Sequence, residues 1–197
     1  DAFVVKMDTF GVVAWVKHFG STAYDTTILE AAIDDAGNVA VTGQRCAAAC
    51  VGYVAVLAAQ DGAVMWEAEL ARVFVDVDYA LGTWYFAGTA VAGDAPLGLS
   101  LDVSGALMLA VDAASGNATW AATVEDGAAT LVKASGTDVY FTCQGACVQV
   151  HSTASAVALK FEGTYQGGIV KVTATGVPTW TADVAVTVHA GLAVTQD

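Results

Sequence analysis

Apolar and polar residues alternate along most of the chain, in short runs separated by turns that contain glycine. A period of two residues places successive side chains on opposite faces of a strand. Runs such as 1–8 and 139–143 are also rich in valine and aromatic residues, which favour strands. No stretch shows the apolar spacing of an amphipathic helix of useful length. The pattern therefore predicts an all-β fold.

One unit built from these strands recurs four times. Four tryptophans, about 50 to 60 residues apart, each close the same pattern of an alternating strand, a tight turn and a second strand. A glycine stands four residues before each tryptophan and supplies the positive φ that hairpin turns require. The tryptophans are Trp15, Trp66, Trp120 and Trp180, and the glycines are Gly11, Gly62, Gly116 and Gly176.

A second element follows each tryptophan, at 39–43, 84–88, 139–143 and 192–196. In the first three copies this element is preceded by a turn, and the turn by a further apolar strand. The pattern therefore predicts four strands in each unit. Four-stranded units of about 50 residues are typical of β-propeller blades. We therefore predict a single domain over 1–197, a β-propeller-like array of four four-stranded antiparallel blades. The repeats fall at about 1–51, 52–105, 106–166 and 167–197.

Stacking such sheets face to face would bury both faces of each, with a tryptophan filling each gap between blades. At the two ends, either segments 1–8 and 191–197 close a ring or both ends accept a sheet from a partner.

The repeat resembles the SBBP-type β-propeller repeats of secreted bacterial and algal proteins. The residues that carry this resemblance are the segment 1–8, Gly11, Trp15 and the segment 35–43. The segment 110–120, AVDAASGNATW, also resembles the tryptophan-docking repeat of pyrroloquinoline-quinone propellers. The resemblance implies a propeller in a secreted, non-catalytic setting. The chain departs from these families in having four repeats where seven or eight are usual, and in its cysteine loops.

The composition suggests that apolar surface is hidden by other subunits. Hydrophobic residues make up 56% of the chain and charged residues 14%, against about 45–50% and about 25% in ordinary soluble domains. We expect a homo-oligomer or filament neighbours to cover the excess. The net charge of −13 would repel phosphate backbones, so no nucleic-acid partner is expected. Polar residues interrupt every long uncharged stretch, so no membrane span is predicted.

The cysteines form two C-x3-C pairs, Cys46/Cys50 and Cys143/Cys147. This pairing favours two short-range disulfides in an oxidising compartment, with zinc ligation and free thiols as alternatives. A glycosylation sequon begins at Asn117 in a predicted turn. Both features indicate an extracellular or cell-surface protein. The chain starts at Asp1 without an initiator methionine, so we expect a processed or excised piece.

Motifs with chemical meaning are scarce. His18, His151 and His189 have no metal-ligand spacing, and the sequence has no nucleophile elbow, P-loop or zinc-protease motif. We therefore predict no enzyme, no catalytic or metal site and no cofactor.

Acidic pairs are the remaining candidates for acid–base chemistry or calcium binding. We interpret them as turn residues or as the solvated outer face of a blade. They are 34–35, Glu67/Glu69, Asp76/Asp78 and 125–126.

The consecutive aromatic residues 84–86 could form a sugar platform, but packing between blades is the preferred interpretation.

The function predicted from the sequence is a non-enzymatic extracellular structural module, a self-assembling protomer of a filament, surface appendage or coat. The alternative is a propeller module that binds glycan or protein ligands through its loops. A quinoprotein-type enzyme is disfavoured because the chain is too short and lacks a cofactor-binding cluster.

Overall fold

The computed structural model describes residues 1–161 and 167–184 and confirms the all-β class. Apart from the short 3₁₀ segment η1 (Pro96–Gly98), the described elements are strands. They are β1 (Ala2–Met7), β2 (Val13–Phe19), β3 (Asp25–Ile33), β4 (Val39–Cys46), β5 (Cys50–Leu57), β6 (Val64–Leu70), β7 (Phe74–Ala80), β8 (Thr83–Ala90), β9 (Gly105–Asp112), β10 (Ala118–Glu125), β11 (Gly127–Ser135), β12 (Asp138–Gly145), β13 (Gln149–Ser152), β14 (Ser155–Lys160), β15 (Gly167–Thr173) and β16 (Pro178–Asp183).

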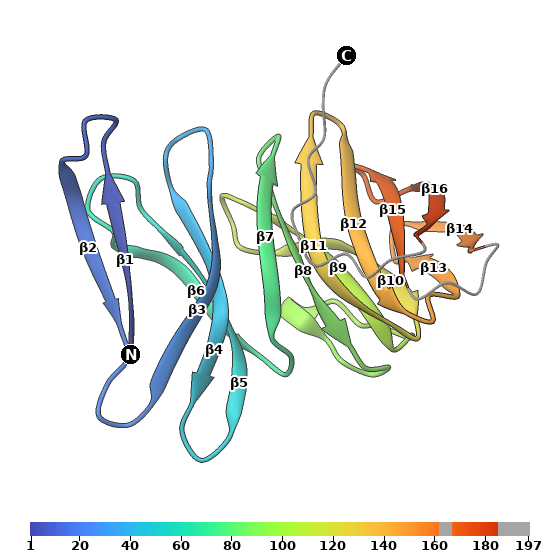
Figure 1. Cartoon of the computed structure of the whole chain (residues 1–197), viewed down its shortest axis with the longest axis horizontal. Helices are drawn as coiled ribbons and strands as arrows, with labels where there is room; N and C mark the ends of the chain where they lie inside the picture. The colour runs from blue at the N-terminus through green and yellow to red at the C-terminus, as the bar shows by residue number, and fades with distance from the viewer. Residues whose placement is uncertain (162–166, 185–197) are drawn as a thin grey trace.

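Four antiparallel sheets follow one another from the N-terminus to the C-terminus (Figure 1). Sheet 1 is β1–β2, sheet 2 is β3–β4–β5–β6, sheet 3 is β14–β13–β10–β9–β8–β7, and sheet 4 is β11–β12–β15–β16. The prediction of four sheets is confirmed. The prediction that each has four strands is wrong, because sheet 1 has two strands and sheet 3 has six within residues 1–161 and 167–184.

Each four-stranded sheet joins the second half of one sequence repeat to the first half of the next. In sheet 2, the two strands that follow Trp15 pair with the two strands around the Gly62 turn. The short 47–49 loop makes β4 and β5 a hairpin, and their register runs from Cys46↔Cys50 to Val39↔Leu57. The sheets therefore begin half a repeat after the sequence units. Sheet 1 is consequently an outer hairpin without an inner strand pair among the described residues.

The two extra strands of sheet 3 come from an inserted hairpin. Strands β13 and β14 lie between β12 and β15 in the sequence, yet β13 pairs with β10 across Thr123↔His151 and Val124↔Val150. The hairpin thus covers the outer edge of sheet 3 instead of extending sheet 4.

The core lies between neighbouring sheets. One buried cluster joins sheets 1 and 2 around Trp15, Phe19 and Tyr53. A second joins sheets 2 and 3, and a third joins sheets 3 and 4 around Trp120 and Phe141. In sheets 2, 3 and 4 the strand that comes earliest in the sequence lies at one edge of its sheet. These three edge strands are β3, β7 and β11, and they lie side by side. The fold is therefore a face-to-face stack of sheets, as the repeat predicts.

Candidate functional site

The recurring contact between sheets is a tryptophan that lies over a turn glycine. Trp15 at the outer strand of sheet 1 covers Gly62, and a Cβ at that glycine would lie 2.8 Å from Cε3 of the indole. Trp66 covers Gly116 and Trp120 covers Gly176 in the same way, with corresponding distances of 3.0 and 2.6 Å. Glycine is needed at these turns both for φ values of +69°, +72° and +83° and for the close approach of the ring.

Two of the three docked indoles also donate a hydrogen bond to the neighbouring sheet. Trp15 Nε1 donates to the carbonyl oxygen of Ala59 at 3.1 Å, and Trp120 Nε1 donates to that of Ala174 at 3.0 Å. Trp66 Nε1 is buried and has no hydrogen-bond partner within the described ranges. The docking contact therefore combines apolar burial with a polar anchor at Trp15 and Trp120 and relies on burial alone at Trp66.

The two ends of the stack each present one half of this contact. The Gly11 turn has φ +78°, but a Cβ there would meet no atom within 4 Å, so the turn is uncovered. Trp180 on β16 is 40% exposed and contacts the ring of Tyr140 at a centroid distance of 6.1 Å. Among the glycines of residues 1–161 and 167–184, none lies beneath it.

The hairpin of sheet 1 is apolar on both faces. Ala2, Val4, Trp15 and Phe19 pack against sheet 2. Phe3, Met7, Phe10, Val12 and Val16 are exposed, and we call this set the N-terminal apolar face. Strands that are apolar on both faces are typical of sheets covered on both sides, and isolated two-stranded sheets are marginal in water. These five exposed apolar side chains therefore belong to one hairpin and its turn.

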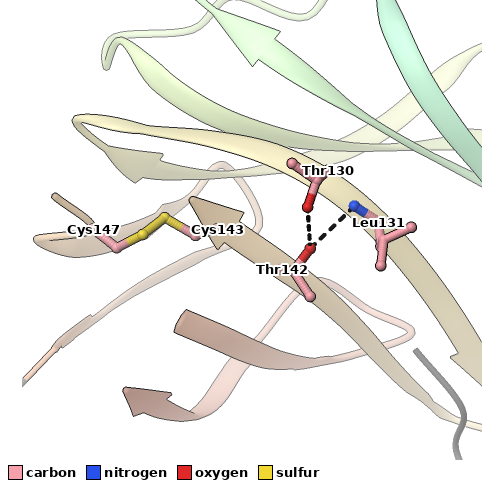
Figure 2. Close-up of a disulfide and its surroundings, with 5 residues drawn as sticks. All are labelled: Thr130, Leu131, Thr142, Cys143 and Cys147. Carbon is pink, nitrogen blue, oxygen red and sulfur yellow. Dashed lines mark hydrogen bonds between the residues drawn. A yellow bond between two sulfur atoms is a disulfide. The ribbon is translucent and has the colours of Figure 1, made fainter. Parts of the chain in front are cut away.

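Both predicted disulfides are present, and no cysteine is free. Cys46–Cys50 closes the loop between β4 and β5, whereas Cys143–Cys147 lies at the end of β12 and is buried. Figure 2 shows Cys143–Cys147 beside a bulge in the β11–β12 ladder, where the Thr142 hydroxyl accepts a hydrogen bond from Leu131 N at 3.1 Å. The structure therefore supports the favoured prediction of two short-range disulfides.

The Glu67/Glu69 pair is half-exposed, as predicted, and both carboxylates contact one arginine. Arg45 Nη1 lies 2.8 Å from Glu69 Oε1, and its Nη2 lies 3.5 Å from Glu67 Oε2. The guanidinium stacks on the rings of Tyr53 and Tyr24, with its carbon 4.1 and 4.5 Å from their centroids. Burial and the hydrogen bond to Glu67 raise the pKa of Tyr53. The cluster therefore links β4, β5 and β6 of sheet 2.

The Asp76/Asp78 pair was predicted on a solvated outer edge, and that prediction is wrong. Both residues lie on β7, the first strand of sheet 3, and face the edge of sheet 4. Asp76 Oδ2 accepts from Val132 N at 2.7 Å, and Asp78 Oδ2 accepts from Ala134 N at 2.8 Å. The reason is that the edge of β11 offers amides that its own sheet leaves unpaired, and two carboxylates satisfy them. Burial raises the pKa of Asp76, while the hydrogen bonds from Val132 and Val77 oppose that shift.

The other acidic pairs act locally. Asp34 Oδ1 accepts from Asn38 N at 2.7 Å, and Oδ2 accepts from Asn38 Nδ2 at 2.8 Å, so this pair holds its turn. Glu125 Oε2 lies 4.0 Å from His151 Nε2. In the part of the chain that the structure describes, no three potential metal-ligating side chains lie together.

The remaining sequence candidates lie apart from one another. His18 is exposed with Nε2 3.9 Å from Asp1 Oδ2, and His189 is outside the described residues, as is the segment 192–196. Asn117 is exposed in the β9–β10 turn, and its glycosylation stays a prediction. Residues 84–86 are all buried between sheets, with Tyr85 6.0 Å from Trp120 between ring centroids. This burial leaves them no surface for a sugar platform.

One pocket has an apolar floor and a charged rim. It has a volume of about 200 Å³ and lies between the end of β6 and the 91–104 loop. Its floor includes the buried residues Phe74, Leu101 and Leu107. At the rim, Arg72 Nε lies 3.2 Å from Asp94 Oδ2. No sequence signal predicts this pocket, because the loop that forms it has no repeat counterpart.

No helix among the described residues has the length and apolar character needed to cross a membrane.

The sequence matches no protein-family model and no curated protein. Among solved structures, the chain is similar to BamB from Moraxella catarrhalis, a β-propeller protein, with 14% identity and a TM-score of 0.35. The similar region covers 87% of this chain and 65% of BamB, so the chain spans less than two thirds of that protein's length. The likeness concerns the fold alone.

Proposed function

We propose that this chain is a non-enzymatic structural module of an extracellular or cell-surface filament, appendage or coat, and that it assembles with copies of itself. The observation that carries the proposal is the N-terminal apolar face. Phe3 is 68% exposed on the two-stranded sheet, and Phe10 is 90% exposed in the turn that joins its strands. Burying apolar side chains of this size contributes about 1.5–3 kcal/mol each, so a partner surface is strongly favoured.

The extracellular setting is supported by the two disulfides, which persist in oxidising compartments. The exposed sequon at Asn117 is consistent with the same setting. Two covalent cross-links also suit a structural protein, because they stabilise its fold.

Sedimentation velocity of the purified chain over a range of concentrations, with negative-stain electron microscopy of the same samples, tests the proposal. We expect species larger than the monomer whose fraction rises with concentration, and rods or rings in the images. The double variant Phe3→Ser/Phe10→Ser should shift the chain toward monomer.

The matched control is Leu81→Asn, which removes another exposed apolar side chain, at a β7–β8 turn position where φ is +50° and asparagine is tolerated. This variant should assemble like the wild type. A wild-type chain that stays monomeric at every concentration would contradict the proposed function.

A second candidate function, a ligand-binding module, is favoured by the pocket beside β6. Its apolar floor and its volume of about 200 Å³ suit one apolar side chain of a protein ligand. N-acetyl-phenylalanine amide titrated against the protein should shift the NMR signals of Leu101 and Leu107. Ala71→Trp, at an exposed lining position, should abolish those shifts. Shifts that are absent in the wild type would remove this candidate.

A further inference from the structure

The two uncovered surfaces at the ends of the stack are complementary halves of one contact. Three tryptophans, Trp15, Trp66 and Trp120, each cover the turn glycine of the next sheet. Two elements of the same repeat are left over, the exposed Trp180 on sheet 4 and the open Gly11 turn on sheet 1. We propose that Trp180 of one copy docks on the Gly11 turn of a second copy, which joins copies head to tail.

The Gly11 turn has the same form as a turn that already accepts a tryptophan. At this turn Asp8 N donates to Val12 O and Gly11 N donates to Asp8 O, at 2.9 and 3.0 Å. At the Gly176 turn, Thr173 N donates to Val177 O and Gly176 N donates to Thr173 O, at 2.9 and 2.8 Å. The glycine φ values are +78° and +83°. The vacant turn therefore has the backbone shape that Trp120 recognises.

The same equivalence identifies the polar anchor. Trp120 Nε1 donates to the carbonyl oxygen of Ala174, two residues before Gly176. The residue two before Gly11 is Thr9, so the Thr9 carbonyl oxygen is the acceptor for Trp180 Nε1. The Gly11 turn is already rigid, because Asp8 Oδ1 accepts from both Phe10 N and Val12 N at 2.9 Å. Little ordering is thus needed when the indole arrives.

We assign the occupant to a second copy, because the two surfaces cannot meet within the described residues of one copy. Sheet 1 and sheet 4 lie at opposite ends of the stack, with sheets 2 and 3 between them (Figure 1). Phe10 and Val12 belong both to the Gly11 turn and to the N-terminal apolar face, so docking there also covers part of that face. A contact between two different surfaces repeats from copy to copy and generates filaments or rings.

The inference rests on the proposed self-assembly and adds the residues that mediate it. Its test uses Gly11→Asn and Trp180→Ala. Asparagine tolerates positive φ, and its side chain would occupy the site of the indole in the assembly while meeting nothing in the free chain. The matched control is Gly82→Asn, at a turn with φ +77° where a Cβ also meets nothing within 4 Å.

In sedimentation velocity, Gly11→Asn and Trp180→Ala should each lose the species larger than monomer, while Gly82→Asn should keep them. Trp180→Phe, which retains a ring without the N–H donor, should weaken association about 2- to 10-fold, the effect of one hydrogen bond. Circular dichroism of each variant checks that the strands are intact.

Mixing the two monomeric variants gives the decisive measurement. Trp180→Ala keeps an intact Gly11 turn and Gly11→Asn keeps an intact Trp180, so an equimolar mixture should form 1:1 dimers and nothing longer. If both variants assemble like the wild type, or if the mixture stays monomeric, the Trp180–Gly11 contact is wrong even though the chain self-assembles. If the wild type itself is monomeric, the proposed function fails as well.

Discussion

The indole of Trp15 lies so close to Gly62 that a Cβ at position 62 would stand 2.8 Å from Cε3 and 2.9 Å from Cδ2 of the ring. The first residue belongs to sheet 1 and the second to the β5–β6 turn of sheet 2. The close stacking of these two sheets therefore requires that position 62 carry no side chain.

Replacing this glycine should destabilise the stack by more than its backbone conformation alone explains. Gly62→Ala places a side chain at φ +69°, which costs about 1–2 kcal/mol, and also displaces the ring, which adds about 1–3 kcal/mol. Gly93→Ala, at φ +92° with no atom within 4 Å of the new Cβ, should show only the first cost. Urea unfolding of both variants measures the difference. Equal losses of unfolding free energy would mean that the tryptophan does not press on the turn.

The two disulfides should differ in their rate of reduction. Cys50 is exposed at a loop, whereas Cys143 and Cys147 are 2% and 6% exposed. A thiolate must reach the sulfur to break the bond, so dithiothreitol should reduce Cys46–Cys50 first under native conditions. Alkylation at successive times followed by peptide mass spectrometry gives the order. In urea, where burial is lost, the two rates should converge, and early labelling of Cys143 without urea would contradict the expectation.

Several features of this molecule follow from local sequence signals. The alternating runs, the turn glycines, the repeated tryptophans and the paired cysteines each report on chemistry within a few residues of one another. These signals were sufficient for the all-β class, the number of sheets and both disulfides.

The features that the sequence did not predict depend on contacts between distant segments. Nothing within 149–160 indicates that this hairpin pairs with β10 rather than with its neighbours β12 and β15. Asp76 and Asp78 alternate with apolar residues as any solvated pair would, and only the β11 edge beside them gives them a role. The Trp180 and Gly11 surfaces were predicted only as repeat positions, because their exposure depends on what stacks against each end.

Asp76 should make the stability of the chain depend on pH. Burial raises the pKa of this carboxyl group in the folded state above its ordinary value of 3.8. A raised pKa means that the folded chain holds the proton more tightly, so the contribution to stability is complete below pH 3.8. It is lost as the pH rises through the folded pKa. The unfolding free energy of the wild type relative to Asp76→Asn should therefore fall over that range and be constant above it.

Asp112 serves as a control of opposite sign. The hydrogen bonds from the Ser115 hydroxyl and amide lower the pKa of this exposed carboxyl group. The unfolding free energy of the wild type relative to Asp112→Asn should accordingly fall as the pH drops through the lowered pKa. Denaturation curves at a series of pH values measure both differences, and the same sign for both variants would refute the assignment.

The tryptophan contacts should differ in how much they depend on the indole N–H. Trp120 Nε1 donates to Ala174 O, whereas Trp66 Nε1 is buried without an acceptor in the described residues. Replacement by phenylalanine removes the same ring atoms at both sites, but only at Trp120 does it break a hydrogen bond and leave a carbonyl without its donor. At Trp66 it removes a buried donor that has no partner. Trp120→Phe should therefore destabilise the chain about 1–2 kcal/mol more than Trp66→Phe.

Trp15→Phe provides an independent check of this difference, since Trp15 Nε1 donates to Ala59 O at 3.1 Å. It should behave like Trp120→Phe in urea unfolding followed by far-ultraviolet circular dichroism, which does not depend on the tryptophan removed. If all three variants lose the same free energy, the hydrogen bonds add nothing to docking, and the stacking of ring on glycine alone holds the sheets together. Such a result would also predict that Trp180→Phe assembles like the wild type, so the folding and assembly measurements test the same polar anchor in two settings.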